Sequence, residues 1–291
     1  MAIFRVSSAE RGQRADVFVA AKHPEFSRSS LEELFNKNMV TIDSKAIKAS
    51  HKLKADDQIR VDETLLRQAP EAIDLPIIYE DENVVVMNKP AGVLTHSKGA
   101  LNTEATVASF LQAKITDKNL TGNRAGIVHR LDRPTSGVII GAKTQEALKY
   151  LQKQFANRKT HKTYIAVVEG NPKELEAIID APIGRNPKKP QTFRVDKDGK
   201  PAQTHYKVVK SIENKNHSYT ELELKPVTGR THQLRVHLAY LGYPIVGDHI
   251  YGHDDGSMLL HAKSLEITLP GGQRKIFEAP LPARFKEFEA K

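Results

Sequence analysis

The run HRLDRPTSG at residues 129–137 constrains this chain more than any other segment, because it places one carboxylate between two guanidinium groups just before a sharp turn. Positive charge from Arg130 and Arg133 is expected to keep Asp132 ionised. Pro134 and the closing glycine favour a turn that presents side chains at the edge of a sheet. A solvated ion pair in a surface loop is the simpler interpretation of such a run. The rest of the chain has to decide between the two.

Composition narrows the classes of protein. The 291 residues include 44 Lys and Arg against 35 Asp and Glu, and the net charge of +9 favours RNA or DNA as a partner without requiring it. The chain has no cysteine, which excludes disulfides, thiolate metal sites and a cysteine nucleophile. No segment approaches the roughly 20 apolar residues that span a bilayer, and the N-terminal segment lacks the apolar run of a secretion signal. We therefore expect a cytoplasmic protein of one or two domains.

A stretch with two prolines and many acids, which we interpret as a linker, covers residues 63–77 and separates two regions. In residues 1–62, a capping-box pattern predicts a short helix over 30–38, and residues 39–42 and 59–61 are typical of strands. Basic residues gather on this helix and on the turns, where they either follow a phosphate backbone or form a solvated face. They are Arg28, Lys37, Lys45, Lys48, Lys52 and Lys54.

Residues 78–291 are typical of a larger mixed domain. The apolar pattern predicts strands over 84–87, 138–140, 164–168 and at Leu222 and Leu224, and helices after Thr144 and over 231–241 with an apolar face of Leu234, Leu238 and Leu241. The second of these strands leads directly out of the turn at Asp132, and the last helix has Arg230 at its entrance. Asp132 is therefore expected just before a rigid strand.

Other catalytic chemistries are less well supported. The histidines are scattered without the acidic partners of a metal site, so we expect no metal. They include His205, His217, His232, His237 and His261. A glycosidase would need a second carboxylate working with Asp132, where the sequence supplies arginines. Ser136 lacks the Gly-x-Ser-x-Gly context and an evident base, so we interpret it as a turn residue.

Four motifs follow one another in the larger region and together resemble the RluA-type pseudouridine synthases. They are NKPAG at 88–92, RLD at 130–132, KTY at 162–164 and GRTHQLRVH at 229–237. The likeness continues into residues 242–248 and 260–262. One departure is Pro134, where the family commonly has an acidic residue, but the Arg-Leu-Asp core is intact.

The resemblance implies a mixed, mainly antiparallel sheet with a central cleft, in which a uridine of RNA is isomerised to pseudouridine without cofactor or metal. Asp132 matches the family's catalytic aspartate. It either attacks carbon 1′ of the ribose or removes a proton from carbon 2′, and the sequence leaves both routes open. Arg230 matches the arginine that pairs with this aspartate.

The remaining site residues carry over in the same way. Tyr164 matches an aromatic residue that stacks on the target uracil, with a hydroxyl that could assist proton removal from carbon 5. Arg130 matches the arginine that fills the space left by the flipped base. Lys162 is expected to support the pocket or contact a phosphate, and Leu260 to form part of its apolar wall.

Roughly residues 12–62 resemble the S-four RNA-binding domain, named after a small-subunit ribosomal protein. The match lies in RADVF at 14–18, FSRS at 26–29, VTID at 40–43 and HKLKADDQI at 51–59. It implies a small α+β module that grips structured RNA, with Arg28 and Lys37 among the contacts, and that carries no chemistry itself.

The sequence thus predicts an α+β enzyme, expected as a monomer, that isomerises uridine in RNA. Large-subunit ribosomal RNA is the expected substrate, and transfer RNA is the alternative. A non-catalytic RNA-binding or ribosome-assembly protein that kept the cleft is the alternative from a different class, and intact Asp132, Tyr164 and Arg230 argue against it. The basic loop at 185–190 either contacts phosphates beside the cleft or is solvated.

Overall fold

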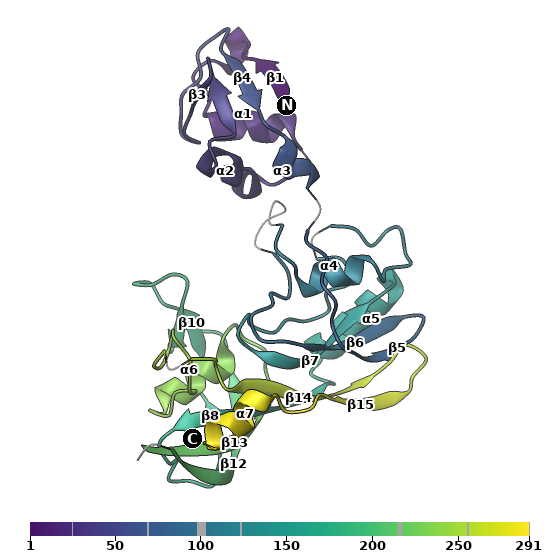
Figure 1. Cartoon of the computed structure of the whole chain (residues 1–291), viewed down its shortest axis with the longest axis vertical. Helices are drawn as coiled ribbons and strands as arrows, with labels where there is room; N and C mark the ends of the chain where they lie inside the picture. The colour runs from purple at the N-terminus through teal and green to yellow at the C-terminus, as the bar shows by residue number, and fades with distance from the viewer. Residues whose placement is uncertain are drawn as a thin grey trace. The chain divides into compact units, whose positions relative to one another are not determined.

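The chain divides into two compact units in the computed structural model, each with its own hydrophobic core (Figure 1). The small unit comprises residues 1–73, 96–109 and 122–124, and the large unit comprises 74–95, 110–121 and 125–291. The structure describes residues 1–24, 26–68, 70–97, 103–122, 124–214, 217–254 and 256–290. Within those ranges, every helix is too short or too polar to span a membrane.

The small unit packs helices against an antiparallel sheet with strand order β1-β4-β2-β3. Its strands are β1 (Ala2–Arg5), β2 (Val40–Ile42), β3 (Lys45–Ala46) and β4 (Gln58–Val61), and its helices are η1 (Ser8–Glu10), α1 (Ala15–Lys22), α2 (Arg28–Asn36) and α3 (Thr64–Arg67). Leu31, Leu34 and Phe35 recur at helical spacing along α2 and form an apolar stripe, which is buried in the core.

Helix α2 begins two residues earlier than predicted. The hydroxyl of Ser27 accepts the backbone N–H of Ser30 over 3.2 Å, so Ser27 is the capping residue and Ser30 lies inside the first turn. The helix ends at Asn36, and Asn38 then adopts a left-handed conformation with φ of 57°. The predicted element is confirmed, with a shift at its start.

The large unit is built on one mixed sheet, in which the described strands follow the order β5-β6-β7-β14-β8-β13-β12-β9, with β15 paired to β14. Its strands are β5 (Ile77–Glu80), β6 (Val84–Lys89), β7 (Ser136–Ala142), β8 (His161–Glu169), β9 (Glu176–Asp180), β12 (Gln203–Asn214), β13 (His217–Pro226), β14 (Leu260–Thr268) and β15 (Arg274–Glu278). Among the described strands, β7 and β14 pair in parallel and all other neighbours are antiparallel. The predicted mixed, mainly antiparallel sheet is confirmed.

The remaining elements lie around this sheet. Strands β10 (Ile183–Arg185) and β11 (Phe193–Val195) form a separate antiparallel ribbon. The helices are α5 (Gln145–Ala156), α6 (Gln233–Tyr240) and α7 (Ala283–Glu289), together with α4 (Val107–Gln112), of which the large unit contains the part from Phe110 onward. Helix α5 begins after Thr144, whose hydroxyl accepts the N–H of Ala147, as predicted.

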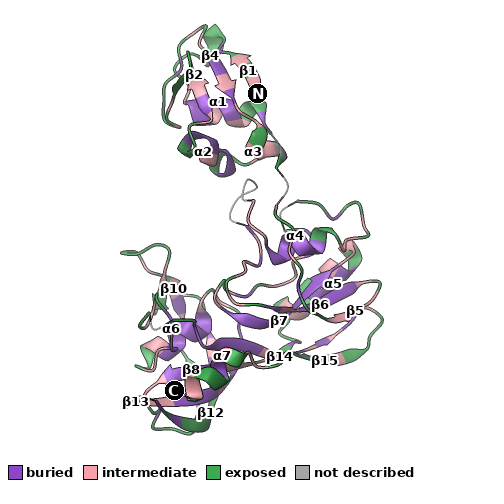
Figure 2. Ribbon diagram, in the orientation of Figure 1, coloured by how far each residue is buried: buried purple, intermediate pink, exposed green. Residues whose placement is uncertain are grey.

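Strand β7 forms the rigid element that follows the Asp132 turn. All seven of its residues are buried, which is the pattern of a strand covered on both faces (Figure 2). Gly137 has a φ of 116°, and a side chain there would collide with the backbone of Ala262 on β14. The close parallel approach of β7 and β14 therefore requires glycine at this position.

Helix α6 is shorter than predicted. His232 precedes it with a left-handed φ of 57°, so the helix starts at Gln233 rather than at Thr231. Leu234 and Leu238 are buried against the sheet, but Leu241 is the capping residue and is 37% exposed, which corrects its predicted place on the buried face. Gly242, with a φ of 85°, ends the helix as expected.

Candidate active site

A pocket of about 470 Å³ opens in the large unit where the loop before β7, the start of β8 and the segment before α6 converge. Its lining includes every large-unit residue that the sequence pattern singled out as a site residue. These are Arg130, Asp132, Lys162, Tyr164, Arg230 and Leu260. Arg28 and Lys37 belong to the small unit, where both side chains are exposed.

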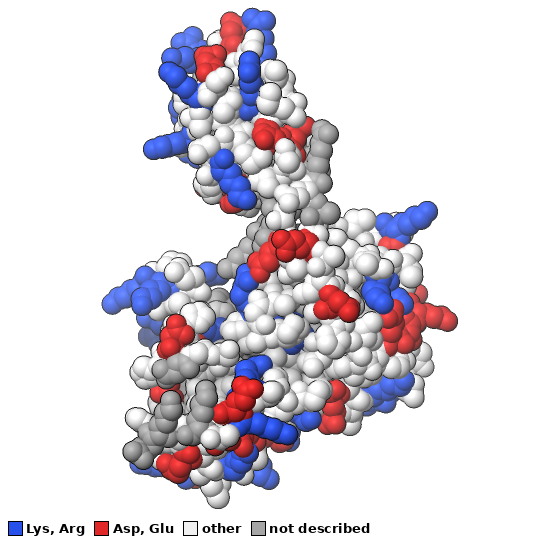
Figure 3. All heavy atoms as spheres, viewed as in Figure 1, with Lys and Arg blue, Asp and Glu red and all other residues white. Residues whose placement is uncertain are grey.

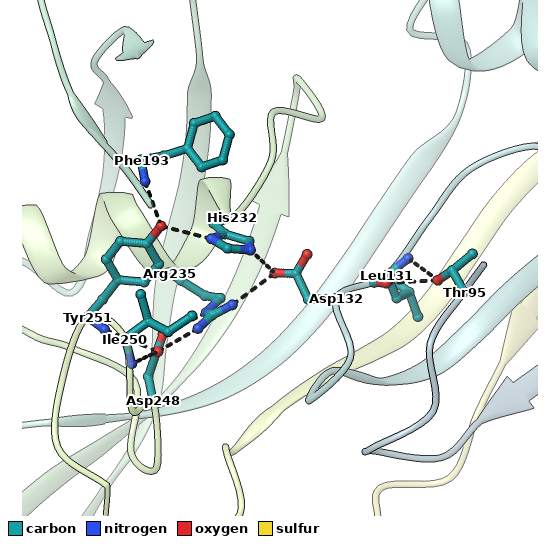
Figure 4. Close-up of polar contacts among 9 residues, drawn as sticks. All are labelled: Thr95, Leu131, Asp132, Phe193, His232, Arg235, Asp248, Ile250 and Tyr251. Carbon is teal, nitrogen blue, oxygen red and sulfur yellow. Dashed lines mark hydrogen bonds and ion pairs between the residues drawn. The ribbon is translucent and has the colours of Figure 1, made fainter. Parts of the chain in front are cut away.

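The backbone on both sides of Asp132 is held by buried polar side chains. Thr95 bonds both polar backbone groups of Leu131, donating to the carbonyl over 2.8 Å and accepting from the amide over 3.1 Å (Figure 4). The ammonium of Lys89 donates to the carbonyl of Arg133 over 3.2 Å and also to the carbonyls of Pro90 and Val93. Burial lowers the pKa of Lys89 to about 7, and the charge of Asp132 opposes this shift. The NKPAG motif thus supports the Asp132 loop through its buried lysine.

Arg235 is the residue that pairs with Asp132, with Nη1 lying 3.3 Å from Oδ2. The Arg235 side chain is only 2% exposed, and Asp248 grips its other nitrogens at 2.7 and 2.6 Å. Burial would raise the pKa of Asp248, but the hydrogen bonds and charge of Arg235 outweigh it and hold the pKa below its usual value. Backbone N–H groups of Ile250 and Tyr251 also donate to Asp248. The guanidinium beside Asp132 is therefore fixed in place before substrate arrives.

The structure differs here from the expectation that Arg230 pairs with Asp132. Arg230 lies on the pocket wall, but its Nε donates to the carbonyl of Pro201 over 3.1 Å and its backbone N–H donates to Gln233. It precedes the left-handed residue His232, whereas Arg235 lies in the first turn of α6 and points back toward the helix start. The GRTHQLRVH motif contains both arginines, and only the turn geometry distinguishes them.

His232 is a further neighbour of Asp132 that the sequence did not reveal. Its Nε2 lies 3.9 Å from Oδ2 of Asp132, and its Nδ1 lies 2.8 Å from the hydroxyl of Tyr251 (Figure 4). Burial lowers the pKa of His232, with the carboxylate of Asp132 opposing the shift. The available signal was the position of His232 inside the GRTHQLRVH motif at 229–237, but its contact with Asp132 joins positions distant along the chain.

One wall of the pocket combines aromatic and apolar groups. Burial raises the pKa of the Tyr164 phenol above its usual value, and the charge of Asp132 adds to this effect. Burial likewise lowers the pKa of Lys162. Leu260 of β14 is 3% exposed. At neutral pH the tyrosine therefore presents a neutral phenol and an aromatic face to the pocket.

His129 closes the same wall. Its ring stacks on Phe155 with centroids 4.5 Å apart, and its Nε2 accepts the backbone N–H of Ile140 over 3.2 Å. Burial lowers its pKa to about 3, with the nearby Lys162 acting in the same direction. The imidazole is therefore a neutral structural group.

Ser136 is the first residue of β7 rather than a turn residue, and it does have a basic neighbour. The parallel pairing of β7 with β14 brings Nδ1 of His261 within 2.9 Å of its hydroxyl, which also accepts a hydrogen bond of 2.6 Å from Arg284. Both Ser136 and His261 are almost completely buried, at 2% and 0% exposure. The pair is closed to substrate, so the absence of a nucleophilic role follows from burial and not from a missing base.

Within the described ranges, no three His, Asp or Glu side chains are gathered in a group that could hold a metal ion. The arrangement instead offers one carboxylate on a fixed loop, a guanidinium held against it, and an aromatic wall. Such a site can bind an unsaturated ring and direct a single carboxylate toward an electrophilic or acidic carbon.

Comparison with known proteins agrees with this geometry. The family model described as RNA pseudouridylate synthase matches residues 83–240. Ribosomal large subunit pseudouridine synthase D of Borreliella burgdorferi is 39% identical, over 96% of this chain and 89% of the relative. The RNA pseudouridine synthase YlyB of Bacillus subtilis is 37% identical, over 97% of this chain and 94% of the relative.

A solved structure shares the fold. Human RNA pseudouridylate synthase domain containing 1 superposes with a TM-score of 0.60 and 29% identity, over 73% of this chain and 86% of the human chain. The sequence match extends along nearly the whole chain, and the matched family region contains Asp132, Tyr164 and Arg235. The chain therefore belongs to the RNA pseudouridylate synthase family and is an isomerase.

Proposed function

We propose that this enzyme isomerises uridine in large-subunit ribosomal RNA, with Asp132 as its catalytic carboxylate. The observation that carries the proposal is the position of Asp132: a carboxylate on a loop braced by Thr95 and Lys89, with a buried guanidinium 3.3 Å away. The substrate class is supported by the Borreliella relative, whose name specifies the large ribosomal subunit.

In the proposed reaction the bond between carbon 1′ of the ribose and nitrogen 1 of uracil breaks first. Asp132 drives this step either by bonding to carbon 1′ or by removing a proton from carbon 2′. The uracil turns within the pocket, carbon 5 bonds to carbon 1′, and the proton of carbon 5 is lost while nitrogen 1 gains one. Arg235 stabilises the negative charge of Asp132 before the reaction, and Tyr164 offers its ring as the stacking face for the uracil.

Arg130 is exposed at the pocket rim, which suits a side chain that fills the space of a flipped nucleotide. Lys162 and Leu260 would hold the uracil and its neighbouring phosphate from the wall that also carries Tyr164. Arg230 would contact the RNA backbone rather than the catalytic carboxylate.

For the small unit we propose the role of an S-four-like RNA-binding module. All six of its basic candidate residues are exposed, and Figure 3 shows Lys and Arg side chains on its surface. Arg28 and Lys37 lie at opposite ends of α2, with side chains that are 61% and 49% exposed. A sequence-independent grip on phosphates is the chemistry that such a surface supports. We also propose that the protein acts in the cytoplasm as a monomer.

The proposal is tested by tritium release from RNA labelled at carbon 5 of uridine. Asp132→Asn is compared with wild type and with Glu278→Gln, an exposed carboxylate on β15, on transcripts of large-subunit ribosomal RNA and of transfer RNA. We expect wild type and Glu278→Gln to release tritium from the ribosomal transcript, and Asp132→Asn to bind it while losing about 10³-fold or more in rate.

Each other outcome rejects a part of the proposal. If Asp132→Asn releases tritium at the wild-type rate, that carboxylate is not catalytic. Release from transfer RNA alone would replace the substrate. Tight binding without release by the wild-type protein would favour a ribosome-assembly role.

A further inference from the structure

A chain of polar contacts leads from the backbone of β11 to the carboxylate of Asp132, and the proposed mechanism does not use it (Figure 4). The amide of Phe193 donates to the hydroxyl of Tyr251 over 2.9 Å, and that hydroxyl lies 2.8 Å from Nδ1 of His232. On the other side of the imidazole, Nε2 lies 3.9 Å from Oδ2 of Asp132.

The Phe193 amide can only donate, so it occupies a lone pair of the Tyr251 oxygen and leaves the hydroxyl proton free. We infer that Tyr251 donates this proton to Nδ1 of His232. A neutral imidazole that accepts at Nδ1 carries its proton on Nε2, the atom that faces Asp132. Tyr251 thereby selects one of the two tautomers of the ring.

The backbone at His232 supports a dedicated placement of this ring. Its φ of 57° is uncommon for a residue other than glycine, and it turns the chain immediately before α6. The ring also lies edge-on to those of Phe193 and Tyr251, with centroids 5.7 and 5.6 Å away. Two aromatic contacts and a turn thus fix its orientation toward the carboxylate.

We propose that His232 is a positioning residue for Asp132, held by Tyr251 in the tautomer that directs an N–H group at Oδ2. The inference rests on the proposed catalytic role of Asp132. Arg235 approaches the same oxygen, so the guanidinium of Arg235 and the imidazole of His232 both face Oδ2. Because neither group faces Oδ1, we assign Oδ1 as the oxygen that meets the ribose. At 3.9 Å the His232 contact is electrostatic, and contacts of this kind shorten in substrate complexes.

Protonation of His232 provides a readout that a merely structural role would not produce. The charged and titratable groups around the ring are Asp132 and Arg130 on the loop before β7, Arg235 in α6, and Asp248 and Tyr251 after it. When the pH falls through the pKa of His232, the ring becomes a second cation beside Asp132 and makes the carboxylate a weaker base and nucleophile. The turnover rate should therefore decrease on the acidic side, with a midpoint that depends on His232.

The test compares kcat and KM for tritium release across pH in His232→Leu, His232→Gln and Tyr251→Phe. Tyr240→Phe is the matched control, because Tyr240 ends α6 with 62% exposure. We expect kcat to fall about tenfold in His232→Leu and Tyr251→Phe, the size of one hydrogen bond to a charged group. KM should stay within about twofold, and His232→Gln should retain activity because its amide still donates. The acidic midpoint should move to lower pH in His232→Gln.

A second readout does not depend on turnover. In protein labelled with nitrogen-15 at histidine, and with the resonance assigned by its loss in His232→Gln, His232 should show a protonated Nε2 and an unprotonated Nδ1. Tyr251→Phe should mix the two tautomers. A proton on Nδ1 in the wild-type protein would overturn the inference.

The two proposals fail in different ways. If Asp132→Asn loses product but His232→Leu keeps the kcat and acidic midpoint of wild type, the inference is wrong and the proposed function stands. If Asp132→Asn keeps its activity, the proposed function fails. If His232→Leu does not fold, Tyr251→Phe and His232→Gln still decide. If both of these variants keep the kcat and the acidic midpoint of wild type, His232 and Tyr251 do not position Asp132.

Discussion

In the small unit, Arg5 and Asp56 form an ion pair in which both side chains are 73% exposed, whereas Arg235 and Asp248 of the large unit pair at 2% and 0% exposure. The first kind of pair contributes little to stability, and water or a phosphate can replace either partner. The second kind is costly to form and costlier to break, because each loss strands a buried charge. An exposed set of charges suits a binding surface that must adapt to RNA, and a buried set suits a carboxylate that must not move.

The largest expected effect comes from breaking the buried pair. Asp248→Asn should lower the free energy of unfolding by about 3 kcal/mol or more, since Arg235 loses its counter-charge, and turnover should fall as well. Asp56→Asn, in the exposed pair, should change stability by less than about 0.5 kcal/mol. Urea unfolding of the full chain measures both. Equal losses in the two variants would contradict the contrast between the units.

Acid should destabilise the large unit through its buried histidines. The pKa of His261 is lowered to about 4 by burial, whereas a histidine in an unfolded chain titrates near about 6.5. Between these values the unfolded chain binds more protons, so stability is lost as the pH falls from about 6.5 to about 4, by at most about 3 kcal/mol for this residue.

Hydrogen-exchange protection factors resolve this effect by unit. Amides of β7 and β14 should lose protection as the pH falls through that window. In His261→Asn, whose overall stability is expected to be lower, the protection factors should depend less on pH. A pH-independent protection of β14 would show that His261 is not held neutral in the folded state.

An intermediate effect is expected from the buried lysine. Lys89→Met leaves three carbonyls without their shared donor, so we expect about 1–3 kcal/mol less stability and a lower kcat through the loosened Asp132 loop. Affinity for RNA should be unchanged. Denaturant titration and steady-state kinetics measure the two parts, and a loss of RNA affinity at full kcat would argue for direct contact with substrate.

The smallest effect is expected from the exposed charges of the small unit. Replacing both Arg28 and Lys37 by Gln should weaken binding of ribosomal RNA and reduce the slope of log affinity against log salt by about 1 to 2, with kcat at saturating RNA unchanged. Filter binding over a salt series gives the slope. An unaltered slope would remove α2 from the RNA-binding surface.

Local patterns were sufficient where neighbours along the chain determine the outcome. The stripe of α2, the Thr144 cap and the run of β7 each follow from residues within one element. The start of α2 was misplaced because Ser30, with Glu33 three residues later, satisfies the capping-box pattern, whereas the cap in the structure is Ser27, which lacks such a partner.

The site required contacts that no local pattern contains. Ser136 meets His261 because β7 and β14 pair in parallel across 125 positions, and Asp132 meets Arg235 across 103. The motif placed both arginines of segment 229–237 near the pocket, but the left-handed turn at His232 decides which one reaches the carboxylate. Tyr251 carried no pattern that distinguished it from a core tyrosine.

The sheet order also has a consequence for synthesis. Strand β14 lies between β7 and β8, although it begins at residue 260, long after β8 ends at Glu169. A chain emerging from the ribosome must therefore leave β7 and β8 without their shared partner until β14 has been translated. The Asp132 loop and the strand that carries Tyr164 are made first, but the strand that joins them is made much later, so the sheet that holds the site cannot be completed before then.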